Sequence, residues 1–235
     1  MTGVDDPYRA VKDRFNRMAL DMLPELAGVV KQAADPLEMA LRLAIAGNVI
    51  DLGVNGEITE DEARRCIQDA LDGPFGGDVD AFRQAVSMAT NILYLADNAG
   101  EIVFDRLLIE QLPSVRLTLA VRGRPILNDA TMADAWTAGL CDIVKVIDNG
   151  SDVPGTILGD CSEAFRQQFA EADLIIAKGQ GNFETLSDET ADIYFLFKVK
   201  CPVIARHIGL PVGTHVLARS TAAPSVAGDK DCARL

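Results

Sequence analysis

Carboxylate and amide side chains gather in the middle of the chain, in the segment LADNAGEIVFD at residues 95–105. Asp97 and Asn98 follow a short apolar run, and Gly100 and Glu101 stand where the next helix is expected to begin. Carboxylate and amide oxygens are hard ligands that suit Mg²⁺ or Mn²⁺ and leave positions for water and a phosphate oxygen. Backbone N–H groups at a helix start also favour an anion. The segment is predicted to bind a divalent cation, and its alternative interpretation is an ordinary turn.

A second polar segment, RGRPILNDATMADA at residues 122–135, follows the next apolar run. Asn128 and Asp129 stand just ahead of an expected helix, and Asp134 lies a little over one turn further on. Taken alone, Asn128 or Asp129 is expected to cap that helix.

A third segment, AKGQGNFETL at residues 177–186, has the composition of a loop that approaches an anion. Gly179 and Gly181 let the backbone come close to a ligand, and Lys178 adds a positive charge beside it. The spacing matches neither a P-loop nor a GxGxxG fingerprint, so the segment indicates anion binding without identifying a nucleotide site.

A fourth segment, FLFKVKCPVIA at residues 195–205, places Lys198 and Lys200 two residues apart in an apolar run. The period of two predicts that both lysines share one face of a strand. Two ammonium groups are costly to bury without an anion, which favours a phosphate contact. The alternative is a pair of lysines whose charged ends extend to solvent at a strand end.

The four polar segments lie in turns between apolar runs and helical segments, which alternate along the chain. These elements must position the turns. Such alternation predicts an α/β fold in which helices cover a mainly parallel sheet, with ligands outside the carboxyl ends of the strands. A doubly wound sheet brings its strand ends to one crevice, so the four segments are expected to meet. The strands are expected at residues 92–96, 117–121, 143–147, 174–177 and 194–200, the last running on towards 202–205.

The first ninety residues have the pattern of helices with caps. Asp6-Pro7 and Asp35-Pro36 each place a capping side chain before a proline, and Thr59 with Glu62 forms a capping-box pattern. The expected domains are a helical subdomain at 1–90, an α/β metal-binding domain at 91–219 and a poorly ordered tail at 220–235. Nothing in the pattern indicates an oligomeric state.

The composition restricts the classes of partner and the cellular locations that are expected for this chain. Acidic residues outnumber basic ones by 35 to 22, a net charge of -13, so nucleic acid is not an expected partner. A small phosphorylated metabolite is an expected partner, because a metal ion and a few lysines can make the local electrostatic potential positive. No apolar run reaches the ~20 residues of a membrane span, and no secretion signal begins the chain, so a cytoplasmic protein without membrane contact is expected.

Five widely spaced cysteines without a CxxC pair indicate neither a zinc site nor a disulfide framework.

The order of the motifs GNVIDLG, LADNAGEIVFD, RPILNDATMADA, KGQGNFETL and KCPVIA resembles the family of metal-dependent damage-control phosphatases, over residues 7–217. The resemblance implies a helical domain joined to a three-layer α/β/α domain. It also implies phosphatase activity on small phosphorylated metabolites, such as sugar phosphates or phosphopantetheine-like compounds. The implied cofactor is one divalent cation, Mn²⁺, Ni²⁺, Co²⁺ or Mg²⁺.

Carried across by position, the resemblance assigns the metal ligands to Asp97, Asn98 and Asp129. It assigns substrate and phosphate contacts to Glu101, Lys178, Asn182 and Lys200, with Asn48 and Asp51 of GNVIDLG approaching from the helical part. Many prokaryotic relatives begin with a further helical segment that contains a Cys-x-x-Cys pair, and this sequence has none. The expected substrate pocket is correspondingly less enclosed.

These assignments imply a mechanism in which the cation lowers the pKa of a bound water and orients it for in-line attack. Lys178 and Lys200 would offset the charge on the phosphoryl oxygens. Either Glu101 or Asp134 is the expected proton shuttle, and a covalent phosphate on Asp97 is an alternative route.

Two other functions are compatible with parts of the sequence. The strand and glycine turn of LADNAGEIVFD is similar to those of S-adenosylmethionine-dependent methyltransferases, but it has one glycine where close cofactor approach usually requires several. A non-catalytic metabolite-binding module would keep the fold, but hard ligands and lysines on one face are costly without anion chemistry.

Overall fold

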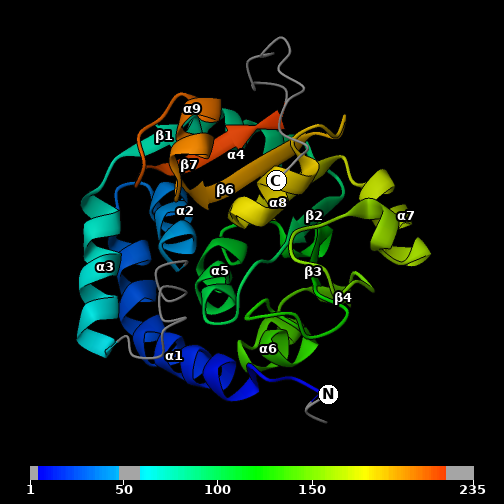
Figure 1. Ribbon diagram of the computed structural model, residues 1–235. Coiled ribbons are helices and arrows are strands. Elements are labelled where there is room, and N and C mark those ends of the chain that lie inside the picture. Colours follow the sequence, from blue (N-terminus) through cyan, green and yellow to red (C-terminus); the bar gives the residue numbers. More distant parts are fainter. Residues whose placement is uncertain (1–4, 48–58, 221–235) are drawn as a thin grey trace.

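The computed structural model of the chain describes residues 5–47 and 59–220, and Figure 1 shows its helices and strands. The helices are α1 (Arg9–Gln32), α2 (Pro36–Ala46), α3 (Glu60–Asp72), α4 (Val79–Met88), α5 (Glu101–Ile109), α6 (Met132–Thr137), α7 (Glu163–Glu171), α8 (Gly179–Leu186) and α9 (Pro202–Ile208). The strands are β1 (Phe75–Gly77), β2 (Ile92–Leu95), β3 (Leu117–Val121), β4 (Lys145–Asp148), β5 (Leu174–Lys178), β6 (Ile193–Lys198) and β7 (His215–Arg219).

The described strands form one sheet in the order β1-β7-β6-β5-β2-β3-β4. Neighbouring strands are parallel throughout, except for the antiparallel pair β6 and β7. Every residue of β2 and β5 is buried, which is typical of parallel strands covered on both faces. The predicted α/β fold with a mainly parallel sheet is confirmed.

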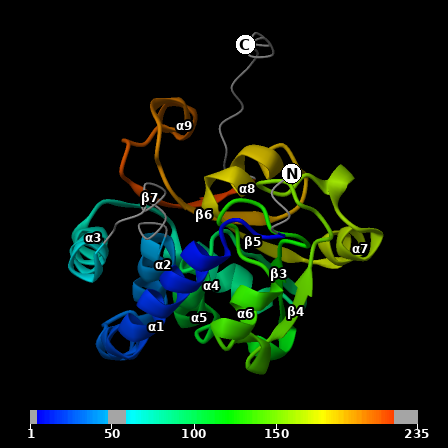
Figure 2. The ribbon, with the colours of Figure 1, turned by 60° about the horizontal axis from the view of Figure 1, so that its bottom comes forward.

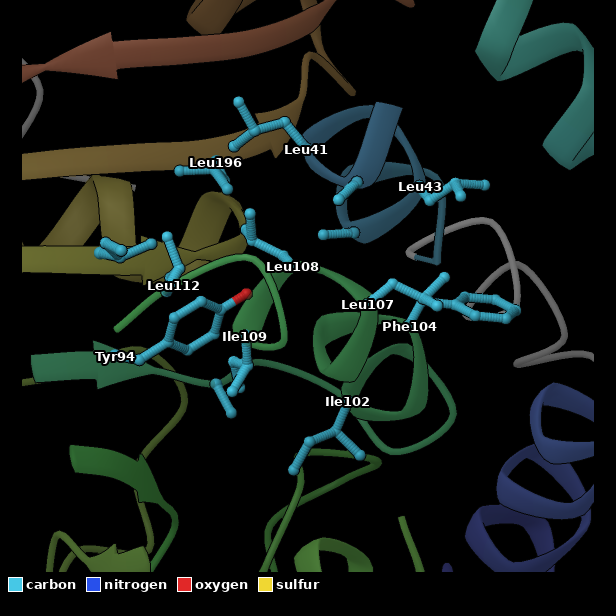
Figure 3. Packing of buried hydrophobic residues seen from close by; sticks show 14 of the residues in the cluster. Leu41, Leu43, Tyr94, Ile102, Phe104, Leu107, Leu108, Ile109, Leu112 and Leu196 are labelled. Carbon is cyan, nitrogen blue, oxygen red and sulfur yellow. The ribbon is translucent and has the colours of Figure 1, made fainter. Parts of the chain in front are cut away.

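Helices cover both faces of the sheet. Helices α1 to α6 share one buried hydrophobic cluster with one face, and α7 to α9 share a second cluster with the other. Figure 2 shows these two helical layers on either side of the strands. In Figure 3, Leu108 and Ile109 of α5 lie beside the ring of Tyr94 on β2, with Leu41 of α2 and Leu196 of β6 above. The arrangement is a three-layer α/β/α fold.

Local capping signals place two of the N-terminal helices as predicted. The Asp35 carboxylate accepts hydrogen bonds from the first amides of α2, where Pro36 is the first helical residue. Thr59 and Glu62 form the predicted capping box of α3. At Asp6-Pro7 the predicted helix start is wrong, because α1 begins at Arg9, but Asp6 Oδ1 does accept from a backbone amide, that of Tyr8 in the turn before the helix.

The C-terminal part differs from the predicted strands. Strand β6 ends at Lys198, and residues 202–208 form helix α9 rather than extended chain, because Pro202 fits the first turn of a helix. Lys200 therefore lies in a loop and does not share a strand face with Lys198. Strands β1 and β7 were not predicted: β1 has three residues, and β7 directly precedes the expected tail. Both take their pairing from neighbours distant in sequence.

A buried histidine at the start of β7 makes the stability of the fold depend on pH. The side chain of His215 is 2% exposed, and burial, with the nearby charges of Lys198 and Arg42, lowers the pKa of His215 to about 4. Between about pH 4 and 6.5 the unfolded chain binds a proton that the folded chain does not, so the free energy of unfolding falls as the pH falls. We expect this group to remove about 2 kcal/mol between pH 7 and 5.

Urea unfolding of wild type and His215→Gln at pH 7 and pH 5 gives the free energy of unfolding at each pH. The difference between the two proteins in how this free energy changes with pH measures the contribution of His215. His207→Gln, which removes the other histidine of the chain, is the control variant. Equal pH slopes for His215→Gln and wild type would contradict the expectation.

Candidate active site at the carboxyl ends of the strands

The site lies where the order of the strands reverses. Strand β2 has β3 on one side and β5 on the other, so the chain proceeds from β2 in one direction and later returns to its opposite edge. Ligands bind outside the carboxyl ends of strands at such a switch point. Asp97 and Asn98 follow β2 there, Gly179 follows β5, and the loop that carries Asp129 follows β3. Three of the four predicted segments therefore meet at one edge of the sheet.

Asn98 and Asp129 lie directly opposite each other in an isolated antiparallel bridge. Backbone hydrogen bonds of 2.8 Å from Ala99 N and from Ala130 N flank the pair. Residues between two such bonds form a non-hydrogen-bonded pair, whose side chains are close and on the same side. The two loops thus bring the Asn98 amide and the Asp129 carboxylate together.

The Asp97 carboxylate lies against the turn between β5 and α8. Gly179 has φ +82°, and a Cβ placed on it would be 2.0 Å from Oδ2 of Asp97. Only glycine is compatible with both the backbone conformation and this approach. The sequence predicted that Gly179 admits a close neighbour, and that neighbour is a carboxylate of the chain itself.

Three carboxylates lie close to Asn98, those of Asp97, Glu101 and Asp129. Asn98 Nδ2 donates to Asp97 Oδ2 at 2.8 Å and to Glu101 Oε2 at 3.2 Å, and Asp129 is its bridge partner. Exclusion of water, followed by the like charges of Glu101 and Asp129, raises the pKa of Asp97 well above its usual range, although Arg122 and Lys178 oppose this. An additional cation at this position would therefore favour the ionised form of Asp97.

Lys178 is fully buried and uses its ammonium group within the protein. Its Nζ donates to Ala44 O at 2.8 Å, to Glu101 Oε1 at 2.7 Å and to Asp105 Oδ1. Burial alone would lower the pKa of Lys178, but the carboxylates of Asp105 and Glu101 outweigh it and raise the pKa. The hydrogen bond from Lys178 holds Glu101 in place, and Tyr94 OH donates to the Asp105 oxygen that Lys178 also contacts.

Arg122 is a site residue that the sequence reasoning did not select. Its Nε donates to Asp129 Oδ2 at 2.6 Å, and its Nη1 donates to Thr156 Oγ1 at 3.2 Å. The buried Nη2 has no hydrogen-bond partner among the described residues. The available signal was position, because Arg122 directly follows β3.

Asn182 connects the loops beneath the site. Its Oδ1 accepts from Thr156 Oγ1 at 2.7 Å, and its Nδ2 donates to Lys178 O at 2.7 Å. Nδ2 also lies 3.4 Å from Ala96 O, at the end of the chain segment that leads to Asp97. In this arrangement Asn182 orients the turns after β2 and β5.

The remaining predicted site residues lie apart from the cluster or outside the described residues. Asp134 is fully buried in the first turn of α6, where it caps the helix and contacts α1. Lys200 is exposed in the loop after β6. Asn48 and Asp51 lie outside the described residues. The preceding residue, Gly47, packs against Glu101, since a Cβ on Gly47 would be 3.2 Å from Glu101 Cα.

The chemistry of the side chains fits a hard cation. Within residues 5–47 and 59–220, no three His, Cys, Asp or Glu side chains are grouped as metal ligands. The expected metal ligands are two carboxylates and one amide. A group of three His, Cys, Asp or Glu side chains would not include all of them, because Asn is not among those residue types. The Nδ2 of Asn98 points at carboxylates, and a half-turn of the amide would present Oδ1 instead. Asp97, Asn98 and Asp129 together supply the oxygen ligands that Mg²⁺ or Mn²⁺ prefers.

Comparison with known proteins places the chain in a family. The damage-control phosphatase ARMT1-like domain matches residues 1–216. A damage-control phosphatase of Pyrococcus horikoshii is 40% identical over 225 residues, which cover 93% of this chain and 76% of that protein. A damage-control phosphatase of Archaeoglobus fulgidus is 39% identical, with 91% and 76% covered.

A solved structure agrees with these sequence matches. The crystal structure of a DUF89 family protein from Pyrococcus horikoshii superposes with a TM-score of 0.80 at 38% identity, covering 93% of this chain and 76% of that one. The match over nearly the whole chain, in sequence and in fold, shows that this chain belongs to the damage-control phosphatase family with the ARMT1-like domain.

Proposed function

We propose that the chain is a metal-dependent phosphatase that hydrolyses phosphomonoesters of small metabolites, with one divalent cation held by Asp97, Asn98 and Asp129. The observation that carries the proposal is the pairing of Asn98 with Asp129 beside the Asp97 carboxylate. Membership of the family supports phosphatase chemistry. Sugar phosphates and phosphopantetheine-like compounds are the substrate classes that we propose to test first.

A bound divalent cation at this site would supply a water of lowered pKa and neutralise charge on a phosphoryl oxygen. Glu101 is the better candidate for accepting a proton, because its Oε2 lies 3.2 Å from Asn98 Nδ2 within the cluster. Asp134 is engaged with α1 and with its own helix N-terminus. We therefore assign proton transfer to Glu101 and a positioning role to Lys178, which holds Glu101 from the other side.

Of the two lysines expected to offset the charge of the phosphoryl group, only Lys200 keeps that role in the proposal. Since the Lys178 ammonium is used by Ala44, Glu101 and Asp105, we propose that Lys200, which is exposed in the loop after β6, approaches the substrate. Asn48 and Asp51 stay predicted substrate contacts. Arg122 orients Asp129 through a 2.6 Å hydrogen bond.

Metal removal and restoration test the proposal. Protein treated with a chelator should lose turnover of an aryl phosphate and of a sugar-phosphate panel, and Mn²⁺, Ni²⁺, Co²⁺ or Mg²⁺ should restore it. Asp97→Asn and Asp129→Asn should lower kcat at least ~100-fold with any of these metals, because each removes a charged ligand. Metal analysis of the purified wild type should give one ion per chain.

Asp80→Asn is the matched control, because the Asp80 side chain is 95% exposed and lies on α4 away from the cluster. It should retain wild-type turnover. Full turnover by chelated protein would exclude metal dependence, and Mn²⁺ binding without turnover on any phosphate tested would favour a binding module.

A further inference from the structure

A buried polar cluster joins α1 to the loops that carry the proposed metal ligands. Lys12 and Asn16 lie on the inner face of α1, and both side chains are 0% exposed. Helix α1 runs beside α5 and α6 (Figure 1). Burying an ammonium or an amide costs free energy unless it is hydrogen-bonded. The partners of these two side chains therefore determine the role of this face.

Asn16 makes one hydrogen bond to each of two distant segments. Its Oδ1 accepts from Gly100 N at 2.7 Å, and its Nδ2 donates to Asp134 Oδ1 at 2.8 Å. These partners are 84 and 118 residues away along the chain. One side chain thus connects the N-terminus of α5 with the N-terminus of α6.

The hydrogen bond from Gly100 N to Asn16 lies close in sequence to two of the proposed metal ligands, Asp97 and Asn98. Gly100 is the N-cap of α5 and follows Asn98 by two residues. Its φ of +77° sets the sharp turn between the ligand pair and the helix. The Asn16 oxygen satisfies the backbone amide at that turn and so restrains the position of the Asp97-Asn98 pair.

The Asp134 side leads to the third ligand. Asp134 Oδ2 accepts from Thr131 N at 2.9 Å and from Thr131 Oγ1 at 2.7 Å, which completes a capping box. Thr131 follows Asp129 by two residues. The Lys12 ammonium lies 3.3 Å from the same carboxylate oxygen and compensates its charge. Asp134 therefore holds the loop of Asp129 while Asn16 holds Asp134.

We propose that Asn16 is a positioning residue that sets the spacing between the Asp97-Asn98 loop and the Asp129 loop. The inference rests on the proposed metal site. Outer partners of metal ligands affect metal affinity because they orient the groups that bind. Here the partner comes from the N-terminal helix, so that helix forms part of the metal site.

The hydrogen-bond directions around Asn16 allow a test by exchange. Asn16→Asp places two carboxylates face to face, and Asp134→Asn leaves an amide donor facing the Asn16 donor. In the double variant Asn16→Asp with Asp134→Asn, the new Asp accepts from Gly100 N and from the new Asn. The new Asn still accepts from Thr131. The hydrogen bonds among these residues and the net charge of the cluster are restored, whereas the ion pairs of Asp134 with Lys12 and Arg9 are not.

Calorimetric titration with Mn²⁺ and thermal unfolding without metal are measured for wild type, both single variants and the double variant. Each single variant should weaken Mn²⁺ binding ~10-fold or more, and the double variant should return to within about threefold of wild type. Asn91→Asp is the matched control, because it removes an amide donor to Glu171 O at the other end of β2. It should lower thermal stability without changing Mn²⁺ affinity.

Single variants that lose thermal stability while keeping wild-type Mn²⁺ affinity would overturn the proposal, as would a double variant that binds no better than the single ones. Phosphatase turnover is measured on the same samples. Wild type that binds Mn²⁺ but hydrolyses no phosphate would refute the proposed function, and the Mn²⁺ affinities would still decide the role of Asn16.

Discussion

Gly179→Ala should remove at least ~99% of the metal-dependent phosphatase activity while the chain still folds. The added Cβ would lie 2.0 Å from the Asp97 Oδ2, a distance that non-bonded atoms cannot adopt, and φ at this position is +82°. The Asp97 carboxylate or the start of α8 must therefore move. Misplacement of a catalytic group by about 1 Å is enough to cost ~100-fold in rate.

Gly181→Ala provides the control two residues further along the same helix. A Cβ there would meet nothing closer than 3.5 Å, so alanine is accommodated and is favoured in a helix. The comparison is made by kcat and by Mn²⁺ affinity for both variants, with circular dichroism to verify folding. Equal activity of Gly179→Ala and Gly181→Ala would show that Asp97 does not act from its observed position.

Lys178→Met should lower the free energy of unfolding by about 3–5 kcal/mol, because it leaves buried carboxylates without their cation. The Lys178 ammonium donates to Glu101 and Asp105, and all three side chains are at most 1% exposed. Burial already raises the pKa of Asp105 to about 6 with Lys178 present. Chemical denaturation at pH 7 measures the loss, and turnover should fall with it because Glu101 loses its support.

Adding Asp105→Asn to Lys178→Met should recover part of the lost stability, since it removes one uncompensated charge. Turnover should stay low in that double variant, because Glu101 still lacks its partner. Lys145→Met, which replaces an exposed lysine on β4, should change stability by less than ~0.5 kcal/mol. A loss below about 1 kcal/mol for Lys178→Met would contradict the ion-pair network.

Charge balance explains why the same residues serve stability and the proposed chemistry. Asp97, Glu101, Asp105 and Asp129 face two buried cations, Lys178 and Arg122. Lys178 pairs with Glu101 and Asp105, and Arg122 pairs with Asp129. The four carboxylates outnumber the two buried cations at the end of β2, where the additional cation is proposed to bind.

Local patterns in the sequence determined the elements and the positions of the polar turns. The apolar run of β3 was predicted with its observed bounds, and β2 and β5 were predicted to within one residue. The caps of α2 and α3 were also predictable from short spacing rules. These features depend on residues a few positions apart, so composition and period are sufficient to identify them.

Only the tertiary structure decided which polar side chains meet. Lys178 pairs with carboxylates 73 and 77 residues away, and Asn16 bonds to residues 84 and 118 residues away. An amphipathic pattern assigns Lys12 and Asn16 to no apolar face, yet both are buried. Asp134 contacts both side chains, Gly100 N bonds to Asn16, and Asp6 bonds to Lys12. The pairing of β1 with β7 has the same cause. Hydrogen bonds between distant segments are not encoded in local period, and they decide the arrangement of this site.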